Sequence, residues 1–178
     1  MTAADAEIQF CPRCGQALER RHTSGRLRPV CPNCDYIHFF DPKVAAAVLV
    51  EREGKVLLVR RVMSPEIGKW TTPGGFVDAG EDPRAAAARE CLEETGLSVE
   101  VAGLLDVLFT NEHPRSADIV IFYRAAVVGG QLKAADDADV AVFFGPDDLP
   151  EIAFGTTRRI LEEWARRVAP QIQADDRA

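Results

Sequence analysis

The stretch from Gly74 to Leu97 constrains the fold most strongly, because it has the features of a complete and unusual helix. It reads GGFVDAGEDPRAAAARECLEETGL. Asp82 is a good N-cap, Pro83 suits the first helical position, and Gly96 suits the position after the last turn. The pattern therefore predicts a short helix between these caps, preceded by a glycine-rich turn.

Acidic residues gather on one side of this helix. Four glutamates and one aspartate lie between Glu81 and Glu94, and the bases in that interval are Arg84 and Arg89. Since each helical residue advances by about 100°, the carboxylates at positions 90, 93 and 94 fall within an arc of roughly 100°. Like charges at this spacing destabilise a helix unless a cation relieves them, and carboxylate oxygens suit Mg²⁺ or Mn²⁺. We therefore predict a divalent-metal site on this face.

The opposite side of the helix is expected to pack against a sheet. It carries Ala88, Cys91, Leu92 and Thr95. Cys91 is accordingly predicted to be a small buried residue and not a reactive thiol.

The other four cysteines form two CxxC pairs, Cys11/Cys14 and Cys31/Cys34, with sixteen residues between the pairs. Two residues between thiolates let a tight turn direct both sulfurs at one ion, and the second pair completes a tetrahedron. A disulfide framework is not expected without an export signal. We predict a zinc ribbon over residues 1–41, held by structural Zn²⁺ because so short a segment cannot form its own core.

The predicted ribbon is also basic. Five arginines and one glutamate lie between Cys11 and Cys34. Two interpretations stay open: a solvated rim on a structural module, or a surface that helps to contact phosphate or nucleic acid.

From Lys43 onward the pattern is that of an α/β domain. The runs VAAAVLVE and KVLLVRRV predict a hairpin that turns at Arg52 to Gly54, and their continuous apolar character predicts a sheet covered on both faces. Further strands are predicted at 99–109, 119–128 and 140–144. A last helix is predicted at 156–168, with Trp164 in the core.

Charge and hydropathy exclude several classes of protein. The chain has 178 residues, 47% of them hydrophobic, and a formal net charge of −7. Polyanions select basic surfaces, so nucleic-acid binding is not expected, whereas a metal ion lets an acidic protein bind a phosphorylated small molecule. The longest apolar run, Val44 to Val50, is too short to span a bilayer, and MTAADAEIQF lacks the parts of a signal peptide. We expect a cytoplasmic protein with no membrane contact.

The stretch from Gly75 to Leu97 resembles the Nudix box, GX5EX7REUXEEXGU, at every fixed position. Cys91 is the one departure, since the family prefers a larger aliphatic residue there. The resemblance implies an α/β/α sandwich with a mixed sheet over residues 42–170, after the zinc ribbon. A disordered tail is expected at 171–178.

The same resemblance implies roles for the residues of the box. Glu90, Glu93 and Glu94 match the ligands of the catalytic Mg²⁺ or Mn²⁺, with Glu90 or a carboxylate from another loop as the base. Glu81 matches a supporting glutamate that ligates a metal or pairs with Arg89, and Arg89 matches the residue that orients a box glutamate. Gly74 and Gly75 match the substrate loop, where the backbone comes close.

The family often recruits one more acidic residue from a loop before the last strand. The segment ADDADVAVFF offers Asp136, Asp137 and Asp139. We favour Asp137 as a further catalytic residue, and a plain polar turn is the alternative.

A zinc ribbon ahead of a Nudix domain narrows the substrate. The NADH pyrophosphatase branch carries an SQPW-type array after the box, and this chain reads SVEVAGLLDVLFTNEHPRS there instead. The segments CPNCDYIHFFDPKVAAAVLVE, KWTTPGGFVD and DDLPEIAF resemble a branch of ADP-ribose and FAD pyrophosphatases. That resemblance implies cleavage of a small nucleotide derivative, ADP-ribose or FAD, to AMP and a phosphorylated remainder.

Two other functions stay open at this point. One is a NAD(H) pyrophosphatase or a hydrolase of NAD-capped RNA 5′ ends, in which the arginines of the ribbon guide the RNA. The other is a non-catalytic nucleotide-binding regulator. The resemblance is also compatible with a homodimer, which is common in the family.

Overall fold

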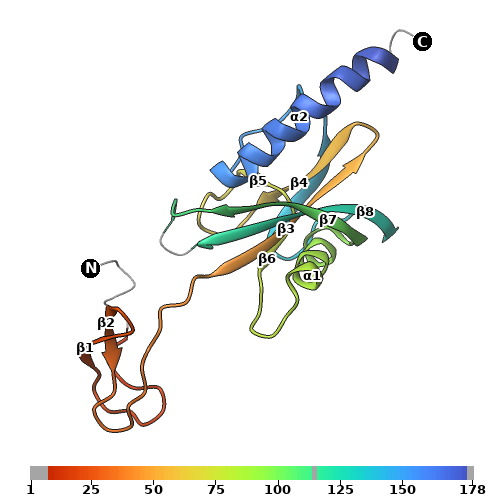
Figure 1. Cartoon of the computed structure of the whole chain (residues 1–178). Helices are drawn as coiled ribbons and strands as arrows, with labels where there is room; N and C mark the ends of the chain where they lie inside the picture. The colour runs from red at the N-terminus through yellow and green to blue at the C-terminus, as the bar shows by residue number, and fades with distance from the viewer. Residues whose placement is uncertain (1–7, 114–115, 176–178) are drawn as a thin grey trace. The chain divides into compact units, whose positions relative to one another are not determined.

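The computed structural model describes residues 8–113 and 116–175. The chain divides into two compact units, Met1–Pro42 and Lys43–Ala178, and each of them is described by itself (Figure 1).

The described part of the smaller unit, residues 8–42, contains one hairpin. Strands β1 (Glu19–Thr23) and β2 (Arg26–Val30) pair antiparallel, from Glu19 opposite Val30 to Thr23 opposite Arg26. A single bridge joins Phe10 to Ala17 before the hairpin, and another joins Val30 to Ile37 after it.

The larger unit is built on a mixed sheet, as predicted. Its strands are β3 (Val44–Arg52), β4 (Lys55–Arg61), β5 (Trp70–Thr71), β6 (Gly74–Phe76), β7 (Leu97–Phe109), β8 (Ile119–Gly130) and β9 (Ala138–Phe144). The main path has the order β5-β4-β3-β8-β7, and β6 pairs with β3 while β9 pairs with β4. Strands β3 and β8 run parallel, and the other pairs are antiparallel.

The predicted β3–β4 hairpin is present, with a turn one residue shorter than expected. Arg52 still pairs with Lys55, so the turn consists of Glu53 and Gly54. Both have positive φ, 53° and 70°. Two residues with φ above zero are what a tight two-residue hairpin needs to match the twist of its strands.

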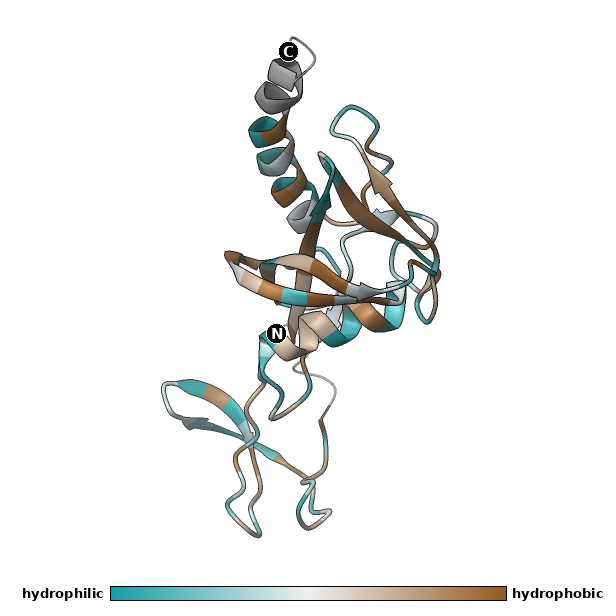
Figure 2. Ribbon diagram, turned by 90° about the vertical axis from the view of Figure 1, so that its right-hand side faces the viewer, coloured by the Kyte–Doolittle hydropathy of each residue, from teal (hydrophilic) through white to brown (hydrophobic). Residues whose placement is uncertain are grey.

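Helices cover both faces of the sheet (Figures 1 and 2). Helix α1 (Pro83–Thr95) packs on one face in a cluster with Val48 and Val50, and α2 (Gly155–Asp175) packs on the other face with Leu49. Successive side chains of β3 thus enter opposite cores. This explains why β3 is apolar at every position from Val44 to Val50, as the prediction of a doubly covered sheet required.

Helix α2 places Trp164 in the core, where it is 2% exposed, as predicted. The helix continues past Pro170, which normally ends a helix, to Asp175, and the disordered tail at 171–178 stays a prediction. Residues 176–178 lie outside the described part of the chain. Within that part, no helix is both long and apolar enough to cross a membrane.

Candidate active site

Helix α1 begins and ends where the caps predicted. The side chain of Asp82 accepts a hydrogen bond from the backbone N–H of Arg84, and Gly96 is left-handed with φ 69°. These caps fix the helix in register and so fix the direction in which each glutamate projects.

The buried side of α1 differs from the predicted one. Leu92, expected to face the sheet, is 48% exposed, whereas Glu94 is 5% exposed. The buried stripe also includes Ala86, Ala87, Cys91 and Thr95. Glu94 therefore lies at the margin of the packed face, next to the apolar residues. Cys91 is fully buried, as predicted.

The carboxylate of Glu94 contacts the first residue of β6. The backbone N–H of Gly74 donates a hydrogen bond of 3.0 Å to Glu94 Oε2. Burial raises the pKa of this carboxyl to about 8, opposed by the Gly74 hydrogen bond. A buried carboxylate with so few donors calls for a positive charge close by.

Gly74 and Gly75 lie in a short strand and not in the predicted turn. They pair with Ala47 and Ala46 of β3. A Cβ on Gly75 would lie 2.5 Å from Glu90 Oε1. The glycine thus leaves room for the Glu90 carboxylate against the strand, and the loop between β6 and α1 begins only after Phe76.

Arg89 gathers the remaining carboxylates of the helix. Its Nε and Nη2 donate to the two oxygens of Glu81 at 2.8 and 2.9 Å. Its Nη1 donates to Glu90 at 2.7 Å and to Glu93 at 3.0 Å, and Nη2 also donates to the carbonyl of Phe76 at 3.2 Å. The guanidinium lowers the pKa of Glu81 to about 2. This bidentate pair ties the loop before α1 to the helix.

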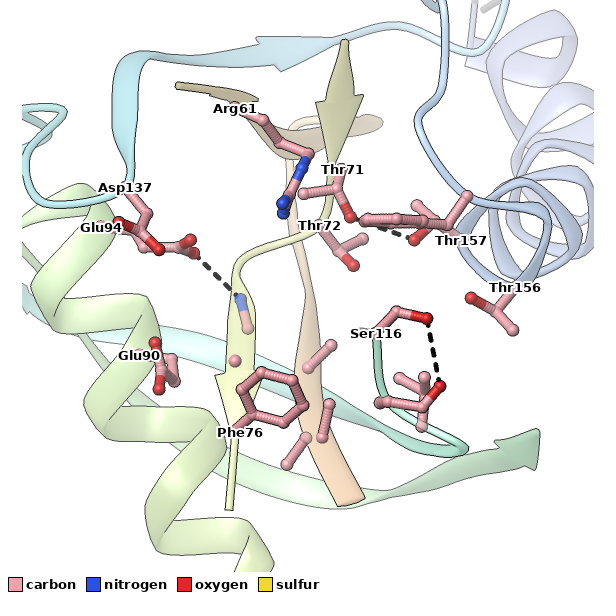
Figure 3. Close-up of a pocket in the computed structure, with 18 of the residues that line it drawn as sticks. Arg61, Thr71, Thr72, Phe76, Glu90, Glu94, Ser116, Asp137, Thr156 and Thr157 are labelled. Atoms are coloured by element: carbon pink, nitrogen blue, oxygen red, sulfur yellow. Dashed lines mark hydrogen bonds between the residues drawn. The ribbon is translucent and has the colours of Figure 1, made fainter. Parts of the chain in front are cut away.

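One pocket collects these groups (Figure 3). It has a volume of about 550 Å³. Glu90, Glu93 and Glu94 line it from α1, and Asp136 and Asp137 line it from the segment before β9. In Figure 3 the carboxylates of Glu94 and Asp137 lie close together, with Arg61 across the pocket from them. Three of the four predicted metal-site glutamates therefore share one wall, whereas Glu81 is not among the residues that line the pocket.

The segment before β9 separates the three candidate aspartates. Asp136 and Asp137 line the pocket, whereas Asp139 forms an ion pair of 2.7 Å with Arg60. The backbone N–H of Val62 donates to the carbonyl of Asp137 at 3.0 Å, which fixes this segment beside β4. The geometry is compatible with the choice of Asp137 and leaves Asp139 outside the site.

The acidic wall fits a hard divalent cation. Its ligand atoms are carboxylate oxygens, the donors that Mg²⁺ and Mn²⁺ prefer. In the described ranges, no three of these carboxylates bring their oxygens within 4.8 Å of one another, so they do not form a closed cage. The group of ligand atoms that does meet this distance consists of the four cysteines. Mg²⁺ keeps several waters and needs few protein ligands, so an open wall is suitable for it.

The pocket also contains residues that the sequence did not indicate. Thr71 and Thr157 join their hydroxyls at 3.1 Å, and Arg61 projects from the end of β4. Thr72 is 2% exposed, and its Oγ1 has no hydrogen-bond partner among the described residues. These side chains come from segments far apart in the chain, and no local motif marks them.

In the smaller unit, the four cysteines are reduced and form one cluster. The Sγ atoms of Cys11 and Cys34 are 3.7 Å apart, as are those of Cys14 and Cys34, and Cys14 is 3.5 Å from Cys31. A tetrahedron with Zn–S bonds of about 2.3 Å has edges of about 3.8 Å. The spacing therefore fits a Zn²⁺ ion.

The two knuckles have the same backbone. The N–H of Gly15 donates to the carbonyl of Cys11 at 2.9 Å, and the N–H of Asp35 donates to that of Cys31 at 3.1 Å. A hydrogen bond from the Gln16 backbone is the main cause that lowers the pKa of Cys14 to about 6. The pKa of Cys34, by contrast, is raised to about 12, against a Tyr36 backbone hydrogen bond, by burial and the neighbouring sulfurs. A thiolate is the form of cysteine that binds zinc.

Two family models match the chain. The model described as NUDIX domain matches residues 41–167, and the model described as Nudix N-terminal, a zinc ribbon, matches residues 9–39. Together they cover both units.

Similar proteins include the ADP-ribose pyrophosphatase of Methanocaldococcus jannaschii, which is 40% identical over 74% of this chain and 76% of its own length. The NAD-capped RNA hydrolase NudC of Vibrio cholerae is 29% identical over 94% of this chain, which spans 61% of that relative. A NUDIX hydrolase from Nitrosomonas europaea superposes with a TM-score of 0.80 at 32% identity, over 89% of this chain and 91% of its own.

Proposed function

This chain belongs to the Nudix family of hydrolases, and on that premise we propose that it is a metal-dependent ADP-ribose pyrophosphatase. It would cleave the pyrophosphate bond of ADP-ribose to AMP and a phosphorylated remainder. The observation that carries this proposal is the pocket of about 550 Å³ with the glutamates of α1 and Asp137 on one wall.

ADP-ribose is preferred to FAD because of the relatives. The protein from Methanocaldococcus jannaschii, named as an ADP-ribose pyrophosphatase, aligns over 74% of this chain. A pocket for a nucleoside diphosphate derivative must also contact sugar hydroxyls. Hydroxyl groups of Thr71, Thr72, Ser116, Thr156 and Thr157 line the side of the pocket away from α1, which suits such a ligand (Figure 3).

The acidic wall supplies the binding site for the cations that the reaction needs. When bound at Glu90, Glu93 and Glu94, with Glu81 in support, Mg²⁺ or Mn²⁺ would neutralise the pyrophosphate and lower the pKa of a water. Arg89 orients the carboxylates of Glu81, Glu90 and Glu93 through hydrogen bonds. The backbone N–H of Gly74 orients that of Glu94 in the same way.

The chain's own residues then position the attack. Glu90 Oε1 is fixed by Arg89 Nη1 at 2.7 Å, and we assign it the proton of the attacking water. As the new oxygen–phosphorus bond forms, the bridging oxygen leaves with the other phosphate. Asp137 stands beside Glu94 and is the alternative acceptor for that proton (Figure 3).

The test is a hydrolysis screen of ADP-ribose, FAD, NADH, NAD and dinucleoside polyphosphates with Mg²⁺, with the products identified. ADP-ribose is expected to give the highest kcat/KM, and Glu94→Gln is expected to lower kcat for it by more than about 100-fold. The glutamine can still accept the hydrogen bond from Gly74, so the fold should persist.

The exposed Glu100→Gln in β7 is the matched control and should keep full activity. Substantial turnover by Glu94→Gln would overturn the ligand assignment. A wild-type protein that cleaves none of these compounds would point to a non-catalytic nucleotide-binding protein.

A second candidate function is hydrolysis of NAD-capped RNA. The match to the Vibrio cholerae relative extends over 94% of the chain and so includes the ribbon with its arginines. Contacts to an RNA backbone weaken steeply with salt. Cleavage of a capped RNA that is unchanged between low and moderate salt would remove the case for such contacts, and a steep loss would support it.

A further inference from the structure

The pocket contains one cation that the acidic residues do not neutralise at contact distance. Arg61, at the end of β4, and Arg89 are the basic residues that line the pocket in the described chain. Arg89 already forms ion pairs with Glu81, Glu90 and Glu93. Arg61 forms no ion pair within 4.0 Å with any carboxylate of the described ranges, and its hydrogen bonds are to neutral groups.

The guanidinium of Arg61 is nevertheless held firmly. Its Nε donates to the carbonyl of Pro65 at 3.0 Å, and its Nη2 donates to that of Met63 at 3.3 Å. Its Cζ lies 4.9 Å from the centre of the Phe154 ring. Two carbonyls and one aromatic face thus fix the plane of the group and leave Nη1 without a hydrogen bond among the described residues.

Figure 3 shows the guanidinium of Arg61 pointing into the pocket, across from the carboxylates of Glu94 and Asp137. Burial lowers the pKa of Arg61, against the attraction of Glu94, Asp137 and Glu66, and none of these carboxylates forms an ion pair with it within 4.0 Å. A half-buried cation in this position gains most from an anion placed between it and the acidic wall. Thr72, with its unpartnered buried hydroxyl, adds a neutral donor to the same pocket.

We propose that Arg61 is a substrate-binding residue whose Nη1 edge contacts the phosphate oxygens that face away from the acidic wall. A planar guanidinium suits phosphate, which it can bind through two parallel hydrogen bonds. In this arrangement the pyrophosphate lies between two positive sites, the cations on the glutamates and Arg61. This inference rests on the proposed pyrophosphatase function and adds to it a contact from outside the Nudix box.

The adjacent Arg60 offers a matched control. It belongs to the same strand, but it pairs with Asp139 through two hydrogen bonds of 2.9 and 2.7 Å and does not line the pocket. Arg60→Met and Arg61→Met therefore remove the same charge from neighbouring positions, one outside and one inside the pocket.

The experiment measures binding of α,β-methylene-ADP and of adenosine to the full chain with Mg²⁺. Arg61→Met is expected to weaken α,β-methylene-ADP binding by roughly 10- to 100-fold, the loss of hydrogen bonds to a charged group, and to leave adenosine binding unchanged. Arg60→Met should bind both as the wild type does. If Arg61→Met does not fold, as judged by circular dichroism, Arg61→Lys replaces it, with a smaller loss that is again confined to the phosphorylated ligand.

Equal weakening of both ligands would show that Arg61 only shapes the loop at Met63 and Pro65, and unchanged binding of both would exclude contact. Either result overturns the inference while wild-type hydrolysis of ADP-ribose leaves the proposed function standing. A wild-type protein that neither binds α,β-methylene-ADP nor hydrolyses ADP-ribose overturns both.

Discussion

At Gly75 the missing side chain matters more than the freedom of the backbone. Its φ is not in the left-handed region, and it pairs with Ala46 as an ordinary strand residue. The space where a Cβ would lie is filled by the Glu90 carboxylate. The sequence motif indicated that a glycine is needed here, but only the packing of β6 against α1 shows why.

Gly75→Ala is therefore expected to displace Glu90 and to lower kcat by about 10- to 100-fold, since misplacing a reacting group by about 1 Å has an effect of this size. Steady-state hydrolysis of ADP-ribose measures it. Gly103→Ala in β7 is the control, because a Cβ there meets open space and the backbone is also extended. Equal activity of the two variants would contradict the crowding argument.

Arg61 and Thr72 show which residues of the site a sequence does not reveal. The glutamates of α1 belong to one contiguous motif, and helical periodicity is enough to bring their carboxylates together. Arg61 and Thr72 reach the pocket because β4 pairs with β5 and β9, and these contacts are distant in the sequence. Nothing in the local sequence indicates the direction in which the side chain of an arginine at the end of a buried strand points.

At the scale of the element, α1 was predictable at its ends and not along its sides. Asp82 and Gly96 specify both caps through local hydrogen bonds. The middle of the helix reads RAAAARE, and alanine can face either core or solvent, so the sequence does not define a clear apolar stripe. This is why Leu92 was expected to be buried and Glu94 was expected to be opposite the packed face.

The loop before α1 depends on Arg89 for its position. Arg89→Lys keeps a charge but cannot reproduce the bidentate contact with Glu81 while also donating to Glu90 and Glu93. We expect kcat for ADP-ribose to fall by about 10- to 100-fold, the usual effect of losing a group that orients metal ligands. The Mg²⁺ concentration for half-maximal activity should rise at the same time.

Arg84→Lys provides the comparison within the same helix, because Arg84 is exposed and its side chain lies outside the pocket. It should match the wild type in both kcat and Mg²⁺ requirement. A similar defect in both variants would mean that Arg89 acts through the stability of the helix and not through the orientation of the glutamates.

At the scale of the whole molecule, the two units are stabilised by different means. Both hydrophobic clusters of the described chain consist of residues from Ala46 onward. Over residues 8–42 of the smaller unit the buried apolar residues are Cys11, Val30 and Cys31. A segment with so little apolar burial needs a metal to remain folded, whereas the larger unit has a helix packed on each face of its sheet.

Removal of zinc is accordingly expected to unfold the smaller unit alone. After treatment with a strong chelator and return to excess Mg²⁺, Cys11, Cys14, Cys31 and Cys34 should become reactive to an alkylating reagent, while Cys91 should stay protected because it is fully buried under α1. Mass spectrometry of the labelled peptides measures both results in one sample. Hydrogen exchange should rise in β1 and β2 and stay slow in β3.

Labelling of Cys91 together with the others would show that the larger unit depends on the metal for its stability. An unchanged circular dichroism and melting profile would show that the four cysteines hold no structural ion. With Mg²⁺ restored, the rate on ADP-ribose then separates the two functions of the chain: full activity would confine catalysis to the larger unit, and a loss reversed by added Zn²⁺ would assign the ribbon a part in substrate binding.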